Sequence, residues 1–186
     1  MSLQKMKNES DETRPDKLGG VLLIASLILF FSFILYGLVS FIVRGLSPVK
    51  GSLLPLILLS GIGVLIGWLR TRSGNPASRQ FTKAGLLRVK DGALFGSAGS
   101  LLVLLIAQTS ANHASWYNWF NGLIPGLILA IPSAMFIGVS AGGTSGLIIG
   151  KIWKNKYASR VGGALVGISI TIAFILSFIR GILTSG

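Results

Sequence analysis

Two serines lie in short glycine-rich motifs whose spelling matches known nucleophile motifs. Ser140 is the central residue of GVSAG, residues 138–142, which fits the G-x-S-x-G pattern of a nucleophile elbow. That elbow needs a turn between a strand and a helix, together with an acid and a histidine. Ser140 lies inside a long apolar run instead, so we expect no catalysis from it.

Ser145 lies in GTSG, residues 143–146. These four residues resemble the G-x-S-G of rhomboid-type intramembrane proteases, which pair the serine with a histidine on another transmembrane helix. The only histidine, His113, falls in a polar segment that we expect to be a loop. We therefore predict that the protein is not an enzyme, and that His113 is solvated and not a haem or pigment ligand.

Other side chains that carry chemistry are scarce. The chain has no cysteine, one histidine and five acidic residues, which leaves little material for a metal centre or for acid–base catalysis. We expect no metal and no cofactor. The apolar runs contain no charged residue, which argues against proton- or ion-coupled transport.

The composition is that of an integral membrane protein. Of 186 residues, 51% are hydrophobic and 12% are charged, and the mean hydropathy is +0.74. Soluble domains carry roughly 25% charged residues. We predict an all-α membrane protein with a poorly ordered polar tail, residues 1–17, and a single transmembrane domain, residues 18–186, with spans at 18–43, 52–69, 92–108, 122–150 and 161–179.

The distribution of Lys and Arg predicts the orientation of these spans. With the N-terminus in the cytoplasm, inner segments carry 14 basic residues and outer segments carry 3. Lys and Arg accumulate in cytoplasmic loops, so we expect the N-terminus inside and the C-terminus outside a bacterial-type inner or other internal membrane. The alternative divides the fourth run at residues 142–143 and would place the basic residues of 151–160 outside.

The net charge of +12 would suggest nucleic acid in a soluble protein, but in a membrane protein it indicates anionic headgroups. We expect the lipid bilayer as a partner and no nucleic acid. The expected headgroup contacts are the basic residues of two inner loops, 70–91 and 151–160: Arg70, Arg72, Arg79, Lys83, Arg88, Lys90, Lys151, Lys154, Lys156 and Arg160.

The fourth run carries a small residue at every fourth position, which on a helix makes a groove that lets another backbone approach. Its members are Gly122, Gly126, Ala130, Ala134, Gly138, Gly142, Gly146 and Gly150. Shorter stripes occur in the third and fifth runs, at Gly92 and Gly96 and at Gly163 and Gly167. We expect these three spans to pack together. A sharper hypothesis makes the stripe an interface with another membrane protein or a second copy.

The fourth run has 29 residues and would extend about 43 Å as a straight helix, longer than the roughly 30 Å hydrocarbon core. It also contains Pro125 and Pro132, so we expect it to tilt, kink or unwind near residues 142–146.

Two pairs of segments suggest an internal duplication. DGALFG at 91–96 is similar to GGALVG at 162–167, and Gly92 and Gly163 are 71 positions apart. Leu54-Pro55 and Ile124-Pro125 open the second and fourth runs at almost the same separation. Spans two and three would then be a parallel repeat of spans four and five, with chance similarity of Gly/Leu-rich segments as the alternative.

The functional prediction is a non-catalytic membrane protein that acts by helix packing, as a scaffold, assembly factor or complex subunit. The alternative is a small channel or facilitator with a path along the fourth span, lined by hydroxyl groups and backbone carbonyls. A wet polar cavity beside residues 138–146 would favour the channel. A dry bundle with an exposed glycine groove would favour the scaffold.

Overall fold

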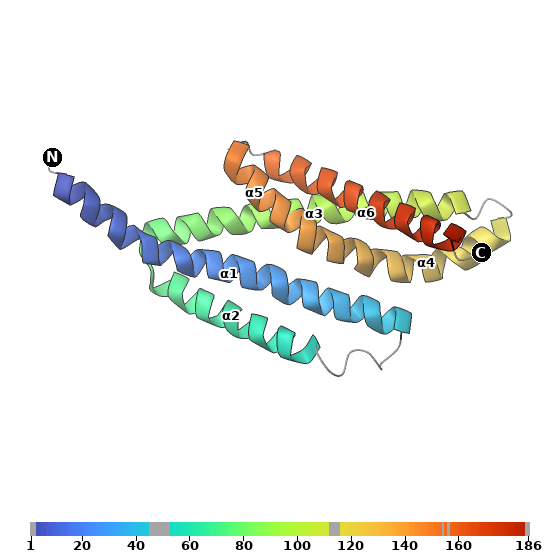
Figure 1. Ribbon diagram of the computed structural model, residues 1–186, viewed down its shortest axis with the longest axis horizontal. Coiled ribbons are helices and arrows are strands. Elements are labelled where there is room, and N and C mark those ends of the chain that lie inside the picture. The colour runs from blue at the N-terminus through green and yellow to red at the C-terminus, as the bar shows by residue number, and fades with distance from the viewer. Residues whose placement is uncertain (1–2, 45–52, 112–115, 154, 156, 185–186) are drawn as a thin grey trace.

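The computed structural model describes the backbone of residues 3–44, 53–111, 116–153, 155 and 157–184, and the side chains of most of them from residue 17 onward. Within these ranges the chain is helical and contains no strand. The elements are α1 (Leu3–Arg44), α2 (Leu53–Ser73), α3 (Pro76–Ala111), α4 (Trp116–Ile137), the π-helical segment η2 (Gly138–Gly142), α5 (Gly143–Trp153) and α6 (Ala158–Thr184). Figure 1 shows them as long helices that lie roughly along one direction.

Five stretches are long and apolar enough to cross a membrane, which confirms the predicted number and order of apolar helices. Their bounds are Lys17–Val43, Leu53–Ser73, Pro76–Thr109, Gly126–Trp153 and Ala158–Ser177.

The segment 70–91, expected to be a loop, is helical except at Gly74 and Asn75. Asn75 Oδ1 accepts a hydrogen bond from the backbone N–H of Ser78 at 2.9 Å, and Pro76 is the first residue of α3. An Asn cap followed by Pro is a common start of a helix. The expectation of a loop was wrong because it treated these residues only as helix breakers.

Other helices also extend beyond the predicted spans. The tail expected to be poorly ordered is helical from Leu3. In the segment 151–160, α5 continues to Trp153 and α6 begins at Ala158, with the Asn155 side chain accepting a hydrogen bond from the Tyr157 N–H at 3.1 Å. The polar segment expected between the third and fourth spans is also shorter, because α3 runs to Ala111.

The fourth span remains helical through residues 142–146, where unwinding was one of the expected outcomes. Its irregularity is η2, in which the backbone N–H of Gly143 donates to the Gly138 carbonyl, five residues earlier. An α-helix bonds four residues back, so η2 is a single wider turn between α4 and α5.

The helices form two units that lie side by side (Figure 1). One unit is the hairpin of α1 and α2. The other consists of α3, α6 and the composite helix α4–η2–α5, which we call the three-helix unit. Helix α2 packs on α1 and barely touches α3, whereas α5 packs directly on α6. The two hairpins of the suggested duplication thus differ in packing, and the duplication remains a prediction from the sequence.

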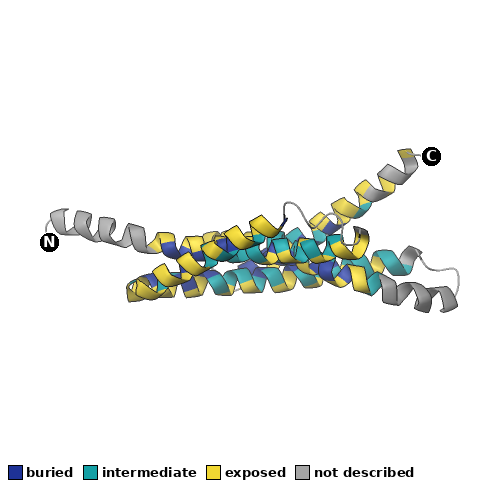
Figure 2. Ribbon diagram, turned by 90° about the horizontal axis from the view of Figure 1, so that it is seen from below, coloured by how far each residue is buried: buried dark blue, intermediate teal, exposed yellow. Residues whose placement is uncertain are grey.

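The interior consists mainly of small residues, and most large apolar side chains point outward, with Leu23, Ile24 and Leu53 as buried exceptions. Ser100 and Thr171 are fully buried, whereas Leu58 is 59% exposed and Phe174 is 67% exposed. Figure 2 shows the buried positions along the middle of the bundle, and the C-terminal part of α6 leaving it. Beyond Thr171, none of the described residues of α6 is buried. A soluble bundle has the opposite distribution, because its large apolar side chains avoid water.

Candidate functional site

The glycines of the fourth span lie directly against the backbone of α3. A Cβ atom on Gly142 would lie 2.7 Å from the Gly92 carbonyl oxygen and 3.1 Å from the Gly96 Cα. On Gly146 it would lie 2.6 Å from the Gly92 Cα and 2.9 Å from the Arg88 carbonyl oxygen. These positions have no room for a side chain, and the neighbours that fill the space are backbone atoms.

Helix α6 approaches the same part of α3 from another side. A Cβ atom on Gly163 would lie 2.6 Å from the Gly92 Cα, and one on Gly167 would lie 2.9 Å from the Gly96 Cα. Both pairs keep the separation of 71 positions along the chain, so α3 and α6 run parallel and in register. The similar sequences at 91–96 and 162–167 therefore occupy one shared contact.

We call this cluster the glycine core. It joins three helices through positions at which an added Cβ atom would lie 3.0 Å or less from the backbone of a neighbouring helix. Such close approach allows dispersion contacts and Cα–H···O contacts between backbones. Its members are Gly92 and Gly96 of α3, Gly138, Gly142 and Gly146 of the fourth span, and Gly163 and Gly167 of α6.

The other described residues of the stripe are the two alanines and the glycines nearer its ends. Ala130 and Ala134 are buried, and a Cβ atom on Gly126 would meet the side chain of Gln108. A Cβ atom on Gly150 would meet the Ser159 hydroxyl group. The side-chain environment of Gly122 lies outside the described residues.

The two motif serines donate hydrogen bonds to backbone carbonyls. Ser140 Oγ donates to the Phe136 carbonyl oxygen at 2.6 Å, one turn earlier. Ser145 Oγ lies 3.0 Å from the Gly142 carbonyl oxygen and 3.4 Å from that of Gly162 on α6. These are the bonds of helix-embedded hydroxyl groups. His113 lies outside the described residues, and within them no three His, Cys, Asp or Glu side chains gather.

An apolar groove separates the α1–α2 hairpin from the three-helix unit, and we call it the lateral groove. It has two adjoining compartments, with cavity volumes of about 810 and 500 Å³, which share Ile28, Leu29 and Thr144. Helix α1 forms one wall and the fourth span forms the other. Leu29 is 50% exposed and Ile148 is 53% exposed, so the groove is open along its side.

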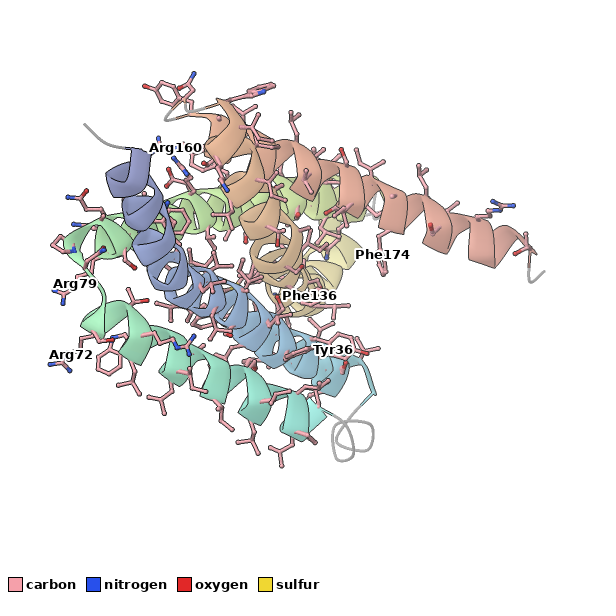
Figure 3. The ribbon with its side chains drawn as sticks, turned by 60° about the vertical axis from the view of Figure 1, so that its left-hand side comes forward. Tyr36, Arg72, Arg79, Phe136, Arg160 and Phe174 are labelled. Atoms are coloured by element: carbon pink, nitrogen blue, oxygen red, sulfur yellow. The ribbon has the colours of Figure 1, made fainter. Side chains whose placement is uncertain are left out.

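One polar group in this groove lacks a partner. Ser32 is 7% exposed and lines the smaller compartment, and its hydroxyl group has no hydrogen-bond partner among the described residues. Tyr36 and Phe136 face each other nearby from α1 and α4, with ring centroids 6.0 Å apart (Figure 3). A buried hydroxyl group without a partner is costly.

The basic residues gather at the end of the bundle where α2 ends, α3 begins, and α5 meets α6. Figure 3 shows Arg72 and Arg79 side by side at this end, with Arg160 further along it. Arg160 Nε lies 3.0 Å from Asp91 Oδ2, and the Arg72 guanidinium lies 5.4 Å from the ring centroid of Trp68. Of the ten expected headgroup residues, Lys154 and Lys156 lie outside the described side chains. The other five are on the same helices: Arg70 on α2, Lys83, Arg88 and Lys90 on α3, and Lys151 on α5.

Sequence reasoning missed a second close contact, between α1 and α2. A Cβ atom on Gly67 would lie 2.6 Å from the Leu23 backbone nitrogen and 2.7 Å from its Cα, and one on Gly63 would meet Ser26. The four-residue spacing of Gly63 and Gly67 was the available signal.

A comparison of the chain with protein-family models, curated proteins and solved structures found no match.

Proposed function

We propose that the protein spans a membrane five times and acts without catalysis, through helix packing, as a scaffold, assembly factor or subunit of a membrane complex. The five apolar helices and the outward-facing large side chains support the membrane placement. We place the basic end in the cytoplasm of a bacterial-type cell, with the C-terminus outside, because Lys and Arg concentrate there.

The exposed glycine groove that would favour a scaffold is not found at Gly138, Gly142 and Gly146, which α3 covers, so the packing role rests on the lateral groove. The groove is flanked by helices along its length, and its lining is apolar except at Ser32, Tyr36, Ser140, Thr144 and Lys151. Hydroxyl groups that bond across helices contribute on the order of 1 kcal/mol each in membranes. A transmembrane helix of a partner protein is the occupant that fits this mostly apolar lining.

The glycine core fixes the position of the fourth span, which forms one wall of the lateral groove. The fourth span cannot move toward α3, because the α3 backbone already touches it at Gly142 and Gly146. The hairpin on the other side contacts this unit mainly through α1. With a rigid wall on one side and a separately packed hairpin on the other, the lateral groove could admit a partner's transmembrane helix from the lipid.

The channel alternative has less support. The face of the fourth span that carries the glycines is covered by α3 and α6, so a path along it would require these helices to separate. The opposite face borders the lateral groove, whose lining is mostly apolar side chains.

The test uses a photoreactive phenylalanine analogue in place of Ile148, which lines the groove and is 53% exposed. The matched control replaces Leu94 of α3, which is 59% exposed and lines no described cavity. We expect irradiation of cells to give one protein adduct of fixed mass from position 148 and none from position 94.

A second variant shows whether the groove itself is responsible. Ala25→Leu fills the larger compartment from α1 and should reduce the adduct several-fold without lowering thermal stability, whereas Ala98→Leu, at an exposed position of α3, should not. Lipid adducts alone at position 148, or equal protein adducts from both positions, would contradict the proposal.

A further inference from the structure

A second groove lies at the basic end, on the other side of α1 from the lateral groove. It is formed by α1, α2 and α3, has a cavity volume of about 370 Å³, and we call it the basic groove. Three cations of α3 line it: Arg79, Lys83 and Lys90. Trp68 of α2 lines it as well.

We propose that the basic groove is a binding site for an anionic phospholipid, with the phosphate between the cations of α3 and an acyl chain against the apolar part of the lining. The inference shares with the proposed function only the membrane placement. It does not depend on a protein partner or on the lateral groove.

The spacing of the cations puts them on one face of α3. Lys83 follows Arg79 by four residues and Lys90 follows Lys83 by seven, so each side chain lies one or two turns from the last. Such a row exists only because 76–91 is a helix that continues into the apolar part of α3. A flexible loop would not hold the three charges in a fixed array.

No acidic side chain lines this groove, so its charge is not neutralised from within the described part of the chain. The nearest acidic residue along α3, Asp91, is paired with Arg160 of α6 at 3.0 Å. The Arg79 guanidinium already donates one hydrogen bond, to the Arg72 carbonyl oxygen at 2.5 Å, so fewer of its N–H groups are left for an anion. Lys83 and Lys90 are therefore the two cations on which anion binding should depend most.

The rest of the lining selects a lipid over a soluble phosphate. Leu23, Leu86 and Leu87 give the groove an apolar floor next to the cations. The ring of Trp68 is 47% exposed at the rim and has the Arg72 guanidinium above it. Tryptophan prefers the depth at which headgroups meet acyl chains, and basic pockets between helices at this depth suit anionic headgroups.

The experiment uses the full chain in nanodiscs that contain phosphatidylcholine with a small fraction of phosphatidylglycerol. Bound lipid is counted by native mass spectrometry after gentle release. We expect wild-type protein to retain one phosphatidylglycerol preferentially. Each basic residue near an anionic surface changes binding about fivefold, so K83Q/K90Q should weaken the preference about thirtyfold.

The matched control is K17Q/R180Q, which removes the same charge from exposed positions that do not line the basic groove. It should retain the preference. Brominated phosphatidylglycerol should also quench tryptophan fluorescence in wild-type protein, and W68F should lose most of this quenching.

Three results would overturn the proposal. K83Q/K90Q could retain phosphatidylglycerol as wild type does, or both double variants could lose it equally, which would indicate general surface attraction. Soluble glycerol 3-phosphate could displace the lipid at matched concentration, which would make this a site for a free phosphate. Equal thermal stability of the variants in detergent excludes misfolding as the cause of a loss.

Discussion

Two adjacent glycines differ sharply in the space around them. Gly142 faces the α3 backbone, with the Gly92 carbonyl oxygen 2.7 Å from a would-be Cβ atom. Gly143 faces Val89, whose Cγ1 would lie 3.3 Å from the new atom and whose carbonyl oxygen would lie 3.6 Å away. A valine methyl group can shift by a few tenths of an ångström, whereas a packed helix backbone cannot do so without moving the whole helix.

We therefore expect Gly142→Ala to destabilise the protein and Gly143→Ala not to. The first substitution inserts a methyl group into a closed contact, and overpacking of this kind typically costs about 1–3 kcal/mol. The second should be neutral or stabilising by up to about 1 kcal/mol, because alanine reduces the freedom of the unfolded chain. Thermal unfolding in mild detergent measures both, and equal midpoints for the two variants would show that the close α3 contact is absent.

At the scale of the elements, hydropathy predicted five apolar helices and missed where they end. A charged helical segment such as 76–91 has no apolar run to mark it, and its signal is the Asn75-Pro76 start. The sequence also could not predict which helices pack on each other, because the length of an apolar run carries no information about its neighbours. The glycine stripes indicated which spans could approach closely, but Gly63 and Gly67 needed the structure to show α1 as their partner.

The cap of α3 gives a prediction for this element. Asn75→Ala removes the acceptor for the Ser78 N–H and should lower stability by about 1 kcal/mol. Asn75→Asp keeps an acceptor and should retain most of it. Hydrogen exchange of the first α3 amides should accelerate in Asn75→Ala.

Ser73→Ala serves as the control for this cap. The Ser73 hydroxyl group donates only to carbonyls of α2, including that of Leu69 at 3.2 Å, so its loss should leave the α3 amides unchanged. Equal acceleration in both variants would mean that the Asn75 side chain does not cap α3.

At the scale of the whole molecule, the candidate sites could be predicted only in part. The basic residues were identified from the sequence, but the basic groove requires α2 and α3 to lie on either side of α1. The lateral groove arises because α2 packs on α1, so the hairpin covers the fourth span only through α1 and only in part. Neither arrangement can be deduced from periodicity, since both depend on contacts between distant segments.

Single cysteines test the predicted orientation, because the chain has none of its own. Suitable exposed positions are Gln80 and Asn155 at the basic end and Thr184 near the C-terminus, whereas Ser78 is too buried to react. In intact cells, an impermeant thiol reagent should label only Thr184→Cys. All three variants should react after solubilisation.

Labelling of Asn155→Cys in intact cells would contradict the orientation with the basic end inside. Labelling of both Gln80→Cys and Asn155→Cys, with Thr184→Cys protected, would indicate the inverted orientation of the same five spans.

The π-helical turn affects the direction in which the glycines of the fourth span face. On an α-helix each residue turns about 100°, so positions four apart drift by about 40° per step around the axis. From Gly126 to Gly150, this drift on a regular α-helix would place the last glycines on a different side of the helix from the first. The wider turn at Gly138–Gly142 rotates less per residue and offsets part of this drift. The four-residue repeat thus faces the α3 backbone both where the turn begins, at Gly138, and after it, at Gly142 and Gly146.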